Sequence, residues 1–552
     1  MFFRISAALS CFYALTFVNL SFGLNVLFIS DGRAGHLTPM FELAKAMNNH
    51  NITFLTERMA QSYIDLDSFS SPRFRLIYVD NSTDALLKEK HLHQQLMDLL
   101  SDRSLLTAAP QLISLMTDVV AAFYLKIFEI LTYERFDAIV ADHMMFGVPI
   151  LCKAASTPCI LQGATYIPSI FDLNLPHGFS LLTENEMTQL PYRIYNTIFT
   201  GYATIRLAPL LIPTYYRFLQ SLPQGSGPFQ DMFTLKNVFS TDTKCLQLLS
   251  IPSSFFSAPY PNQYQKYLGA FIDETPIDDD NSTLTAWVKS KPTSSIIFGA
   301  FGSSSIIPYD RMYNLINGLA KFLLQTNDSF LLLALRDINY KTYETVLKDL
   351  SDGNYRQILE NKERIWIEQG FVKQKWILRQ TSVKIFFSHC GMGSILEALY
   401  FMKPIVCMPF NMDQFMIARR IENLKLGQSL FIRSDLLQSL LSLGDFTNYT
   451  FTDESVAQKV STLWTDVIYE QSVERMSLEI KHSGGTQRAV KEIEFFVKLN
   501  GSLDNYTPFA NTLPFYQRYP LDLLFIFIIL PVIIIRYILS KCCKKRKKTK
   551  TE

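Results

Sequence analysis

The stretch from residue 371 to residue 414 constrains the fold of this chain more than any other part. Val383–Ser388 is a short run of apolar, β-branched and aromatic residues, which predicts a strand buried on both faces of a parallel sheet. Gly391 and Gly393 follow almost at once, and Ser394 is a candidate N-cap with an acid three residues later. The stretch therefore predicts a strand, a glycine-rich turn and a helix, as in an α/β protein.

This predicted unit has the chemistry of an anion-binding site. The free N–H groups and the dipole at a helix N-terminus attract phosphate, and His389 at the strand end can add a donor. Glu397, one turn into the helix, can accept both hydroxyls of a ribose. Asp413 and Gln414, after the predicted strand Pro404–Pro409, supply an acceptor and an amide for sugar hydroxyls. An ordinary capping box and a tight turn would explain the same local pattern, so these residues alone leave both interpretations open.

The wider spacing resembles the donor-binding signature of the family-one UDP-glycosyltransferases, and especially the animal UDP-glucuronosyltransferases. Gln374 lies fifteen positions before His389, and the motif H-C-G-M-G-S-I-L-E and a later D-Q follow. The resemblance implies an α/β fold of the GT-B type, with two Rossmann-like domains facing a cleft. The residues that it assigns to UDP-sugar binding in this segment are Gln374, His389, Gly391, Gly393, Ser394, Glu397, Asp413 and Gln414.

The chain departs from the resembled family at three positions. The family usually has Trp and Pro where Phe371 and Lys373 stand, and many members have Asn where Gly393 stands. The stacking platform for the uracil ring is therefore in question. Trp376 and Trp366 are the aromatic residues nearby that would replace it.

The N-terminal half predicts a second βα unit. Leu24–Ser30 reads as a strand, the loop D-G-R-A-G-H follows, and a helix is expected from about Thr38 to Asn49. The resemblance makes His36 in this loop the catalytic base. It also makes Asp142, at the end of the predicted strand Phe136–Ala141, the carboxylate that orients it. A capping or exposed histidine and a solvated strand-end carboxylate are the alternatives.

A third strand-end loop carries Gly302 and Ser303, after the predicted strand Ser294–Phe298, and resembles the phosphate-contacting turn of the same family. The run Asp278–Asp280 could instead hold a divalent ion in a metal-dependent transferase. A charged linker explains the run equally, and a helix N-terminus can bind the diphosphate without a metal. We therefore expect no metal site and no cofactor, with the UDP-sugar as a co-substrate.

Both ends of the chain predict a membrane-anchored, luminal protein. Arg4, an apolar run and small residues ending at Gly23 have the layout of a secretory signal peptide. Residues 521–540 are apolar over about one bilayer thickness, and a lysine-rich tail follows, as on the cytosolic side of a span. Lysines three and five from the carboxyl end resemble an endoplasmic reticulum retrieval signal. Seven N-x-S/T sequons lie between the two hydrophobic segments.

These signals predict the following organisation of the chain. The boundaries are a signal peptide at 1–23, an acceptor-binding α/β domain at 24–272, a linker at 273–283, a UDP-sugar-binding α/β domain at 284–499, a stalk at 500–520, a transmembrane helix at 521–540 and a cytosolic tail at 541–552. The expected location is the endoplasmic reticulum membrane, single-pass type I, with luminal catalytic domains. Of the eight cysteines, five lie in the luminal part, which is too few and too scattered for a disulfide framework.

The expected function is inverting transfer of a hexosyl group from a UDP-sugar to a hydroxyl of a small lipophilic acceptor. The membrane layout favours glucuronate by analogy, and glucose is the alternative donor. Arg33 beside His36 could pair with a glucuronate carboxylate or be a solvated loop residue. A membrane-anchored scaffold whose site has lapsed is the alternative from another class. The expected partners are the membrane, through one span, and no nucleic acid; a homo-oligomer is left open.

Overall fold

The structure is a computed structural model. It describes residues 23–64, 73–82, 84–102, 105–145, 148–164, 175–221, 244–256, 262–274, 282–302, 305–370, 372–411, 413–433, 435–442, 446, 448–509, 513–518 and 521–548. The predicted signal peptide lies almost entirely outside these residues, and so do most of the predicted linker and the site residue Ser303. The described chain forms two compact units, one of residues 1–259 with 266–501 and one of residues 260–265 with 502–552.

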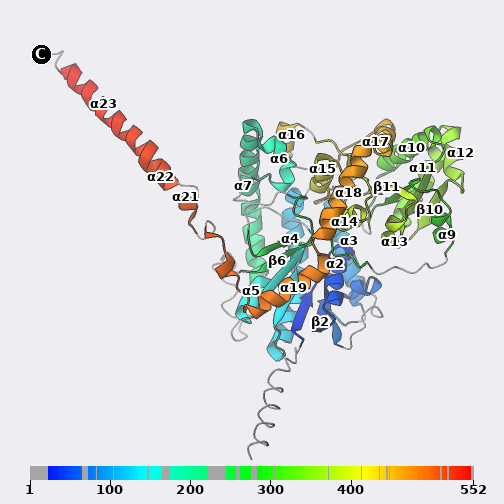
Figure 1. The fold of residues 1–552 in the computed structure, drawn as a ribbon, viewed down its shortest axis with the longest axis horizontal. Helices are drawn as coiled ribbons and strands as arrows, with labels where there is room; N and C mark the ends of the chain where they lie inside the picture. The colour runs from blue at the N-terminus through cyan, green and yellow to red at the C-terminus, as the bar shows by residue number, and fades with distance from the viewer. Residues whose placement is uncertain are drawn as a thin grey trace, which may run out of the picture. The chain divides into compact units, whose positions relative to one another are not determined.

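Two sheets organise the first unit (Figure 1). The first has the strand order β3-β2-β1-β4-β5-β6-β7, and the second has the order β10-β9-β8-β11-β12-β13. Pairing is parallel throughout β1–β6 and throughout the second sheet. In both sheets the strand order reverses beside the first strand, between β1 and β4 and between β8 and β11. Open α/β sheets bind their ligands at the carboxyl ends of the strands at such a reversal.

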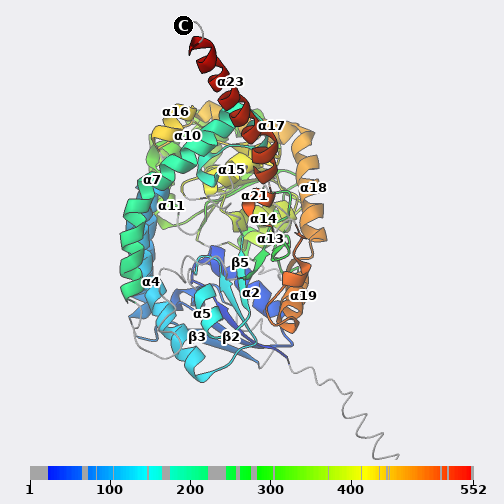
Figure 2. The same cartoon turned by 90° about the vertical axis from the view of Figure 1, so that its left-hand side faces the viewer.

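The elements of the N-terminal half are β1 (Asn25–Ile29), α2 (Ala34–Ala46), β2 (Asn51–Thr56), η1 (Arg58–Ser62), β3 (Phe74–Tyr78), α3 (Ala85–Asp102), α4 (Leu105–Tyr133), β4 (Ala138–Asp142), α5 (Val148–Ala154), β5 (Cys159–Gly163), η3 (Gly178–Ser180), α6 (Glu184–Met187), α7 (Leu190–Ser221), β6 (Leu246–Leu249) and β7 (Gln265–Tyr267). One face of the first sheet packs on α4 and α5. Figure 2 shows α4 running alongside α7.

The elements of the C-terminal half are α9 (Thr283–Lys289), β8 (Ile296–Ala300), α10 (Tyr309–Gln325), β9 (Phe330–Leu335), α11 (Asp337–Asp349), α12 (Gly353–Glu360), β10 (Ile365–Gln369), α13 (Gln374–Arg379), β11 (Val383–Ser388), α14 (Met392–Tyr400), β12 (Ile405–Cys407), α15 (Gln414–Asn423), β13 (Gly427–Ser429), α16 (Leu436–Leu441), α17 (Asp453–Thr465), α18 (Val467–His482) and α19 (Gly485–Lys498). Helices cover both faces of this sheet, α9, α13, α14, α15 and α18 on one and α10, α11, α12 and α17 on the other.

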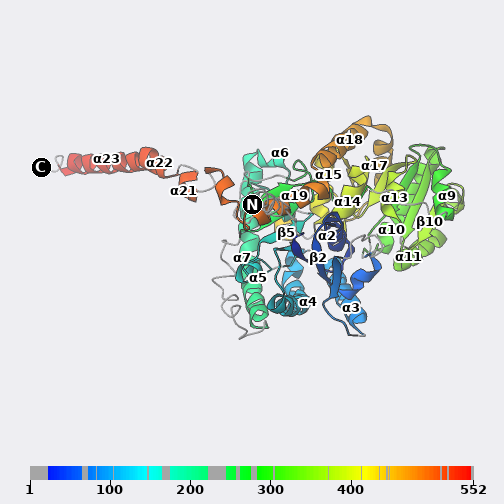
Figure 3. The same cartoon turned by 60° about the horizontal axis from the view of Figure 1, so that its bottom comes forward.

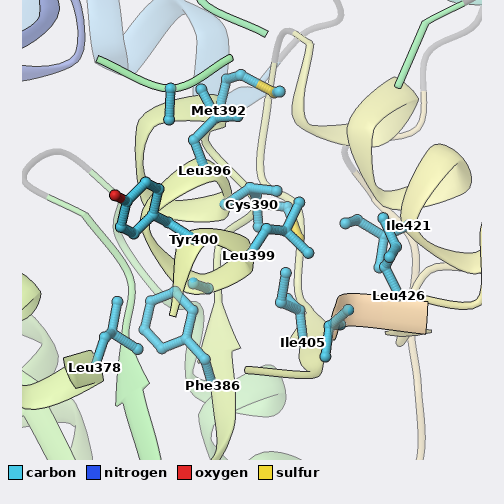
Figure 4. Close-up of a cluster of buried hydrophobic side chains, with 14 of the residues drawn as sticks. Leu378, Phe386, Cys390, Met392, Leu396, Leu399, Tyr400, Ile405, Ile421 and Leu426 are labelled. Carbon is cyan, nitrogen blue, oxygen red and sulfur yellow. The ribbon is translucent and has the colours of Figure 1, made fainter. Parts of the chain in front are cut away.

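Alternate residues of the second sheet point into two separate cores, which is why its strands are apolar without interruption. Phe386 and Ile405 lie under α14 and α15, whereas Phe387 and Val406 face the other core. Figure 4 shows Phe386 below Tyr400 of α14. This packing fixes where α14 begins, because Met392, its first residue, is already buried in the core.

The two halves of the first unit also pack on each other. α18 lies against α14, and the next helix, α19, packs on α2 of the N-terminal half (Figure 3). The short helix α6 is held by ion pairs from Arg433 to Glu186 at 2.7 Å and from Arg420 to Glu184 at 2.7 Å. The last helix before the predicted stalk, α19, thus joins the C-terminal half to α2 of the N-terminal half.

One disulfide joins two strand ends of the second sheet. It links Cys390, two residues after β11, to Cys407 at the end of β12, and both cysteines are fully buried. Cys152, Cys159 and Cys245 are buried free thiols in the N-terminal half. One disulfide is less than a framework, as expected from the cysteine count.

The second unit contains η5 (Asp504–Tyr506), α21 (Phe515–Arg518), α22 (Leu521–Leu524), the π-helical turn η6 (Phe525–Ile529) and α23 (Leu530–Lys548). Within it, Leu521–Lys541 is a continuous helix of 21 residues with a mean hydropathy of 2.7 and no buried residues. By length and composition it could cross a membrane. Among the described residues it is the single such candidate, and it overlaps the predicted span.

Candidate active site

His36 and Asp142 meet at the strand reversal of the first sheet. His36 Nδ1 lies 3.0 Å from Asp142 Oδ2, although the two residues are 106 positions apart. Asp142 ends β4 and is almost fully buried, and its Oδ1 accepts the backbone N–H of Met144 at 2.7 Å. The carboxylate therefore fixes the ring and leaves the second ring nitrogen, Nε2, pointing away from Asp142.

The predicted place of His36 in a loop is wrong, because α2 begins four residues earlier than expected. The carbonyl of Arg33 accepts the N–H groups of both His36 and Leu37, so helical hydrogen bonding starts there. His36 is the third residue of α2. The first turn of a helix holds a side chain more rigidly than a loop does, which suits a catalytic group.

The charges around His36 make it a stronger base. Burial lowers the pKa of His36, but the carboxylates of Asp142 and Asp31 outweigh this effect, and the net pKa is raised. Burial raises the pKa of Asp142, but the charge of His36 and its hydrogen bond outweigh this effect, so the net pKa falls and the carboxyl group stays ionised at neutral pH. The pair has the electrostatics of a base with its counter-ion.

A second carboxylate organises the turn before His36. The Asp31 carboxylate accepts two side-chain hydrogen bonds from Arg33, from Nε at 3.0 Å and from Nη2 at 2.5 Å, and also the backbone N–H of Arg33 at 3.0 Å. Glu57, at the end of β2, accepts the backbone N–H of Gly32 at 2.8 Å. The interpretation of Arg33 as a solvated loop residue is therefore wrong.

His143 is a site residue that the sequence analysis left unassigned. Its ring centroid lies 6.0 Å from that of His36, and its Nδ1 lies 3.7 Å from Asp142 Oδ1. Burial lowers its pKa, so the imidazole is neutral at neutral pH. One ligand atom each from His36, Asp142 and His143 lie within 4.8 Å of one another, an arrangement that could also hold a metal ion. In the sequence, the position of His143 next to Asp142 is the one signal that it could be a site residue.

The predicted phosphate site lies at the strand reversal of the second sheet. α14 begins at Met392 with Gly391 as its N-cap, and no side chain caps its first N–H groups. The prediction that Ser394 is the N-cap is wrong: Met392 is buried in the core and the N-cap is Gly391, three residues earlier, so Ser394 lies in the first turn. The uncapped N–H groups are what an anion site requires.

His389 fills the space beside two of the predicted glycines. A Cβ on Gly391 would lie 2.4 Å from His389 Nε2, and a Cβ on Gly302 would lie 2.7 Å from the same atom. Only glycine fits at these two positions without moving the imidazole. Burial lowers the pKa of His389 to about 4, so the ring is neutral and can donate one hydrogen bond to a phosphate oxygen. Gly393 differs, because nothing lies within 4 Å of a Cβ built on it.

Gln374, Ser394 and Glu397 form one hydrogen-bonded group. Gln374 Nε2 donates to Ser394 Oγ at 3.2 Å and to Glu397 Oε2 at 2.7 Å. Burial raises the pKa of Glu397, and its hydrogen bond from Gln374 only partly offsets this. The structure thus brings Gln374 into contact with Ser394 and Glu397, which lie 20 and 23 positions later in the sequence.

Asp413 and Gln414 are adjacent, but their side chains have different surroundings. The amide oxygen of Gln414 accepts the backbone N–H groups of Phe410 and Asn411, and its Nε2 donates to Asn411 Oδ1. Gln414 therefore shapes the loop and has one N–H left for a ligand. Burial raises the pKa of Asp413, and a backbone hydrogen bond and the charge of His36 lower it only in part.

Two of the expected contacts are not described. Ser303 and Phe371 lie outside the described residues. Trp376 is a residue of α13 whose side chain is buried in the core and cannot provide an exposed uracil platform, so that expectation is wrong. Trp366 packs against Trp287 with ring centroids 5.9 Å apart and donates its indole N–H to Glu368.

Known proteins were compared with the chain as sequences and as structures. Residues 352–551 match the family of UDP-glucoronosyl and UDP-glucosyl transferases. A putative UDP-glucuronosyltransferase of Caenorhabditis elegans is 26% identical over 206 residues, which is 37% of this chain and 35% of that protein. A flavanone 7-O-glucoside 2''-O-β-L-rhamnosyltransferase of Citrus maxima is 29% identical over 147 residues, which is 27% of this chain and 31% of that protein. The chain thus spans about a third of the length of these relatives.

The fold likeness extends further along the chain. The crystal structure of Arabidopsis thaliana UGT89C1 complexed with UDP-L-rhamnose superposes with a TM-score of 0.54 at 15% sequence identity. The match covers 87% of this chain and 99% of that one. The calicheamicin glycosyltransferase CalG4 gives a TM-score of 0.53. The predicted GT-B fold of two Rossmann-like parallel-sheet domains is confirmed. The sequence match over residues 352–551, the relatives and this fold together support the family-one UDP-glycosyltransferases as the family that this chain resembles.

Proposed function

We propose that this chain transfers a hexosyl group from a UDP-sugar to a hydroxyl of a small lipophilic acceptor, with inversion at the anomeric carbon. The observation that carries the proposal is the pairing of two sites in one compact unit. His36 with Asp142 is a base and its counter-ion, and α2, which carries His36, contacts α14, whose uncapped N-terminus is the predicted phosphate site. Glucuronate is the donor that the resemblance favours, and glucose is the alternative.

His36 would activate the acceptor hydroxyl. Its Nε2 would take the proton from the acceptor hydroxyl as that oxygen attacks the anomeric carbon. Asp142 holds the ring by Nδ1 and stabilises the imidazolium that forms. Because the acceptor oxygen attacks opposite the leaving group, one displacement inverts the anomeric configuration.

Groups at the carboxyl end of the second sheet would stabilise the leaving UDP. The UDP that departs gains negative charge, and the uncapped N–H groups of α14 can stabilise this charge. The neutral imidazole of His389 adds a donor. Glu397 would accept the ribose hydroxyls and Asp413 a hydroxyl of the sugar. This assignment gives no step to a metal ion or to a cofactor.

The cellular setting is part of the proposal. The apolar helix Leu521–Lys541 supports a single membrane span, and the lysine-rich end supports a cytosolic tail. A signal peptide, luminal catalytic domains and residence in the endoplasmic reticulum follow from the sequence signals alone. A membrane-bound enzyme of this kind would meet lipophilic acceptors dissolved in the bilayer.

A transfer assay tests the proposed function. The full-length chain in detergent micelles is incubated with UDP-glucose or UDP-glucuronate and 4-nitrophenol, with and without EDTA, and the product is analysed by NMR. We expect a β-linked glycoside from the α-linked donor, at a rate that EDTA leaves unchanged. An α-linked product would contradict the single displacement, and loss of the rate with EDTA would contradict the absence of a metal step. Absence of transfer by folded protein would favour the lapsed scaffold.

A further inference from the structure

Three ligand atoms for a metal ion converge beside the proposed base. One atom each from His36, Asp142 and His143 lie within 4.8 Å of one another. We propose that this group binds Zn²⁺ and that the bound ion switches the transfer reaction off. The inference rests on the proposed function and names a regulation of the same site.

Two imidazole nitrogens and one carboxylate oxygen are a donor set for zinc rather than for magnesium or calcium. Mg²⁺ and Ca²⁺ take oxygen ligands, whereas imidazole suits Zn²⁺. Zinc bonds of about 2.0 to 2.2 Å place two ligands of a tetrahedral ion about 3.3 Å apart. His36 Nδ1 lies 3.0 Å from Asp142 Oδ2, and His143 Nδ1 lies 3.7 Å from Asp142 Oδ1. These two distances bracket the spacing that the ion requires.

The backbone holds all three ligands in place. His36 lies in the first turn of α2, and Asp142 is the last residue of β4. The backbone N–H of His143 donates to the Gln162 carbonyl of β5 at 2.8 Å. The ring of His143 packs against Gly163, where an added Cβ would lie 2.7 Å from Nδ1. Ligands that are already ordered lose less freedom when the ion binds.

An ion from the solvent can reach this group through the two histidines. The side chains of His36 and His143 are 26% and 25% exposed, whereas that of Asp142 is 2% exposed. The buried carboxylate supplies a negative charge where the attraction for a cation is stronger than in water. Three protein ligands leave the fourth tetrahedral position for a water molecule.

A zinc ion would disable the base by taking a lone pair of its ring. Without the ion, the Nδ1–H of His36 donates to Asp142, and the lone pair on Nε2 is free for the proton of the acceptor hydroxyl. An ion at Nδ1 uses the lone pair there, so the one proton of the neutral ring moves through solvent to Nε2. An ion at Nε2 covers the working lone pair directly. In both cases the ring can no longer act as a general base.

Two measurements on the full-length chain in detergent micelles test the inference. Isothermal titration with ZnCl₂ should show a tightest site that binds one ion per chain. Transfer to 4-nitrophenol in metal-free buffer should slow by about ten-fold at about 100 µM ZnCl₂, as a Kd of about 10 µM implies, and EDTA should restore the rate. MgCl₂ at about 5 mM should leave the rate unchanged, because Mg²⁺ takes oxygen ligands.

A ligand variant and a matched control locate the site. His143→Phe keeps a planar ring but removes one ligand, so we expect Zn²⁺ affinity to fall by about ten-fold or more. The inhibiting concentration should rise in proportion, measured against the zinc-free rate of the same variant. His91→Phe makes the same change at an exposed histidine of α3 that bonds Gln95, and it should alter neither quantity. If His143→Phe does not fold, Asp142→Asn should weaken Zn²⁺ binding instead.

The outcomes separate this inference from the proposed function. Zinc inhibition that His143→Phe leaves unchanged, or equal inhibition by Mg²⁺, would overturn the inference while transfer in metal-free buffer upholds the function. Transfer without any Zn²⁺ binding would do the same. Zn²⁺ binding that His143→Phe weakens, in a folded protein with no transfer in metal-free buffer, would uphold the zinc site and overturn the function.

Discussion

Replacing His36 by alanine is expected to lower kcat by about 10²- to 10⁴-fold, the usual contribution of a general base, while UDP affinity stays within about two-fold of the wild type. The reason is geometric. His36 contacts Asp142 in the first sheet, whereas the residues assigned to UDP lie at the carboxyl ends of β8 and β11 in the second sheet. Initial-rate kinetics and isothermal titration with UDP measure the two quantities on one preparation.

The pH dependence of Asp142→Asn separates a base from a merely structural histidine. His36 must be unprotonated to accept a proton, so kcat/KM of the wild type rises with pH up to the pKa of His36. Asp142 raises that pKa, so the variant should show its acidic limb at lower pH, together with a plateau about 10²-fold lower because the ring is no longer held in one tautomer. An unshifted acidic limb, or full activity of His36→Ala, would show that another group is the base.

Replacing Gly391 by alanine is expected to weaken UDP binding by about 10- to 100-fold, which corresponds to the cost of overpacking a fixed site by one methyl group. The new Cβ would lie 2.4 Å from His389 Nε2, far inside van der Waals contact. The imidazole must move, and the first turn of α14 must shift with it. Titration with UDP and a thermal melt of each variant measure the effect.

Gly353→Ala is the matched control for this prediction. Gly353 is the first residue of α12, one position beyond the N-cap position that Gly391 has in α14, and nothing lies within 4 Å of a Cβ built on it. We expect unchanged UDP affinity and a gain in stability of about 0.5 kcal/mol from the reduced freedom of the unfolded chain. If Gly391→Ala bound UDP as well as Gly353→Ala does, His389 and the turn beside it would not be part of the UDP site.

The strands of the second sheet were predictable because burial on both faces leaves a continuous apolar signature. Val383–Ser388 was predicted to the residue as β11. β13, with the sequence G-Q-S, carries no such signature and exists because it pairs with β12. No helix was predicted where α7 runs from Leu190 to Ser221, and the segment contains Pro191, Pro209 and Pro213, a residue type that is unusual inside a helix.

Helix starts were predicted less well than helices. Ser394 has the better capping side chain, but α14 begins at Met392, because burying that side chain outweighs one capping hydrogen bond. The same reasoning applies to α2, where hydrogen bonding to the Arg33 carbonyl begins the helix before Thr38. Tertiary packing decided both boundaries, and a sequence window cannot see it.

The identity of the site residues was more predictable than their tasks. The pairing of His36 with Asp142 followed from the family resemblance and is present in the structure. Gln414 looked like a sugar ligand, yet its amide oxygen accepts two backbone N–H groups of its own loop. Such a task depends on the fold of the loop between Phe410 and Gln414, which no local pattern encodes.

The central claim is that the turn between β11 and α14 binds the diphosphate of UDP. The most direct test is isothermal titration of the full-length chain with UDP in the presence of EDTA, with uridine as the comparison. The account predicts micromolar binding of UDP and binding of uridine at least about 100-fold weaker, because uridine lacks the charged groups that the helix N-terminus attracts. Equal affinity for UDP and uridine, or no binding of UDP by folded protein, would contradict it.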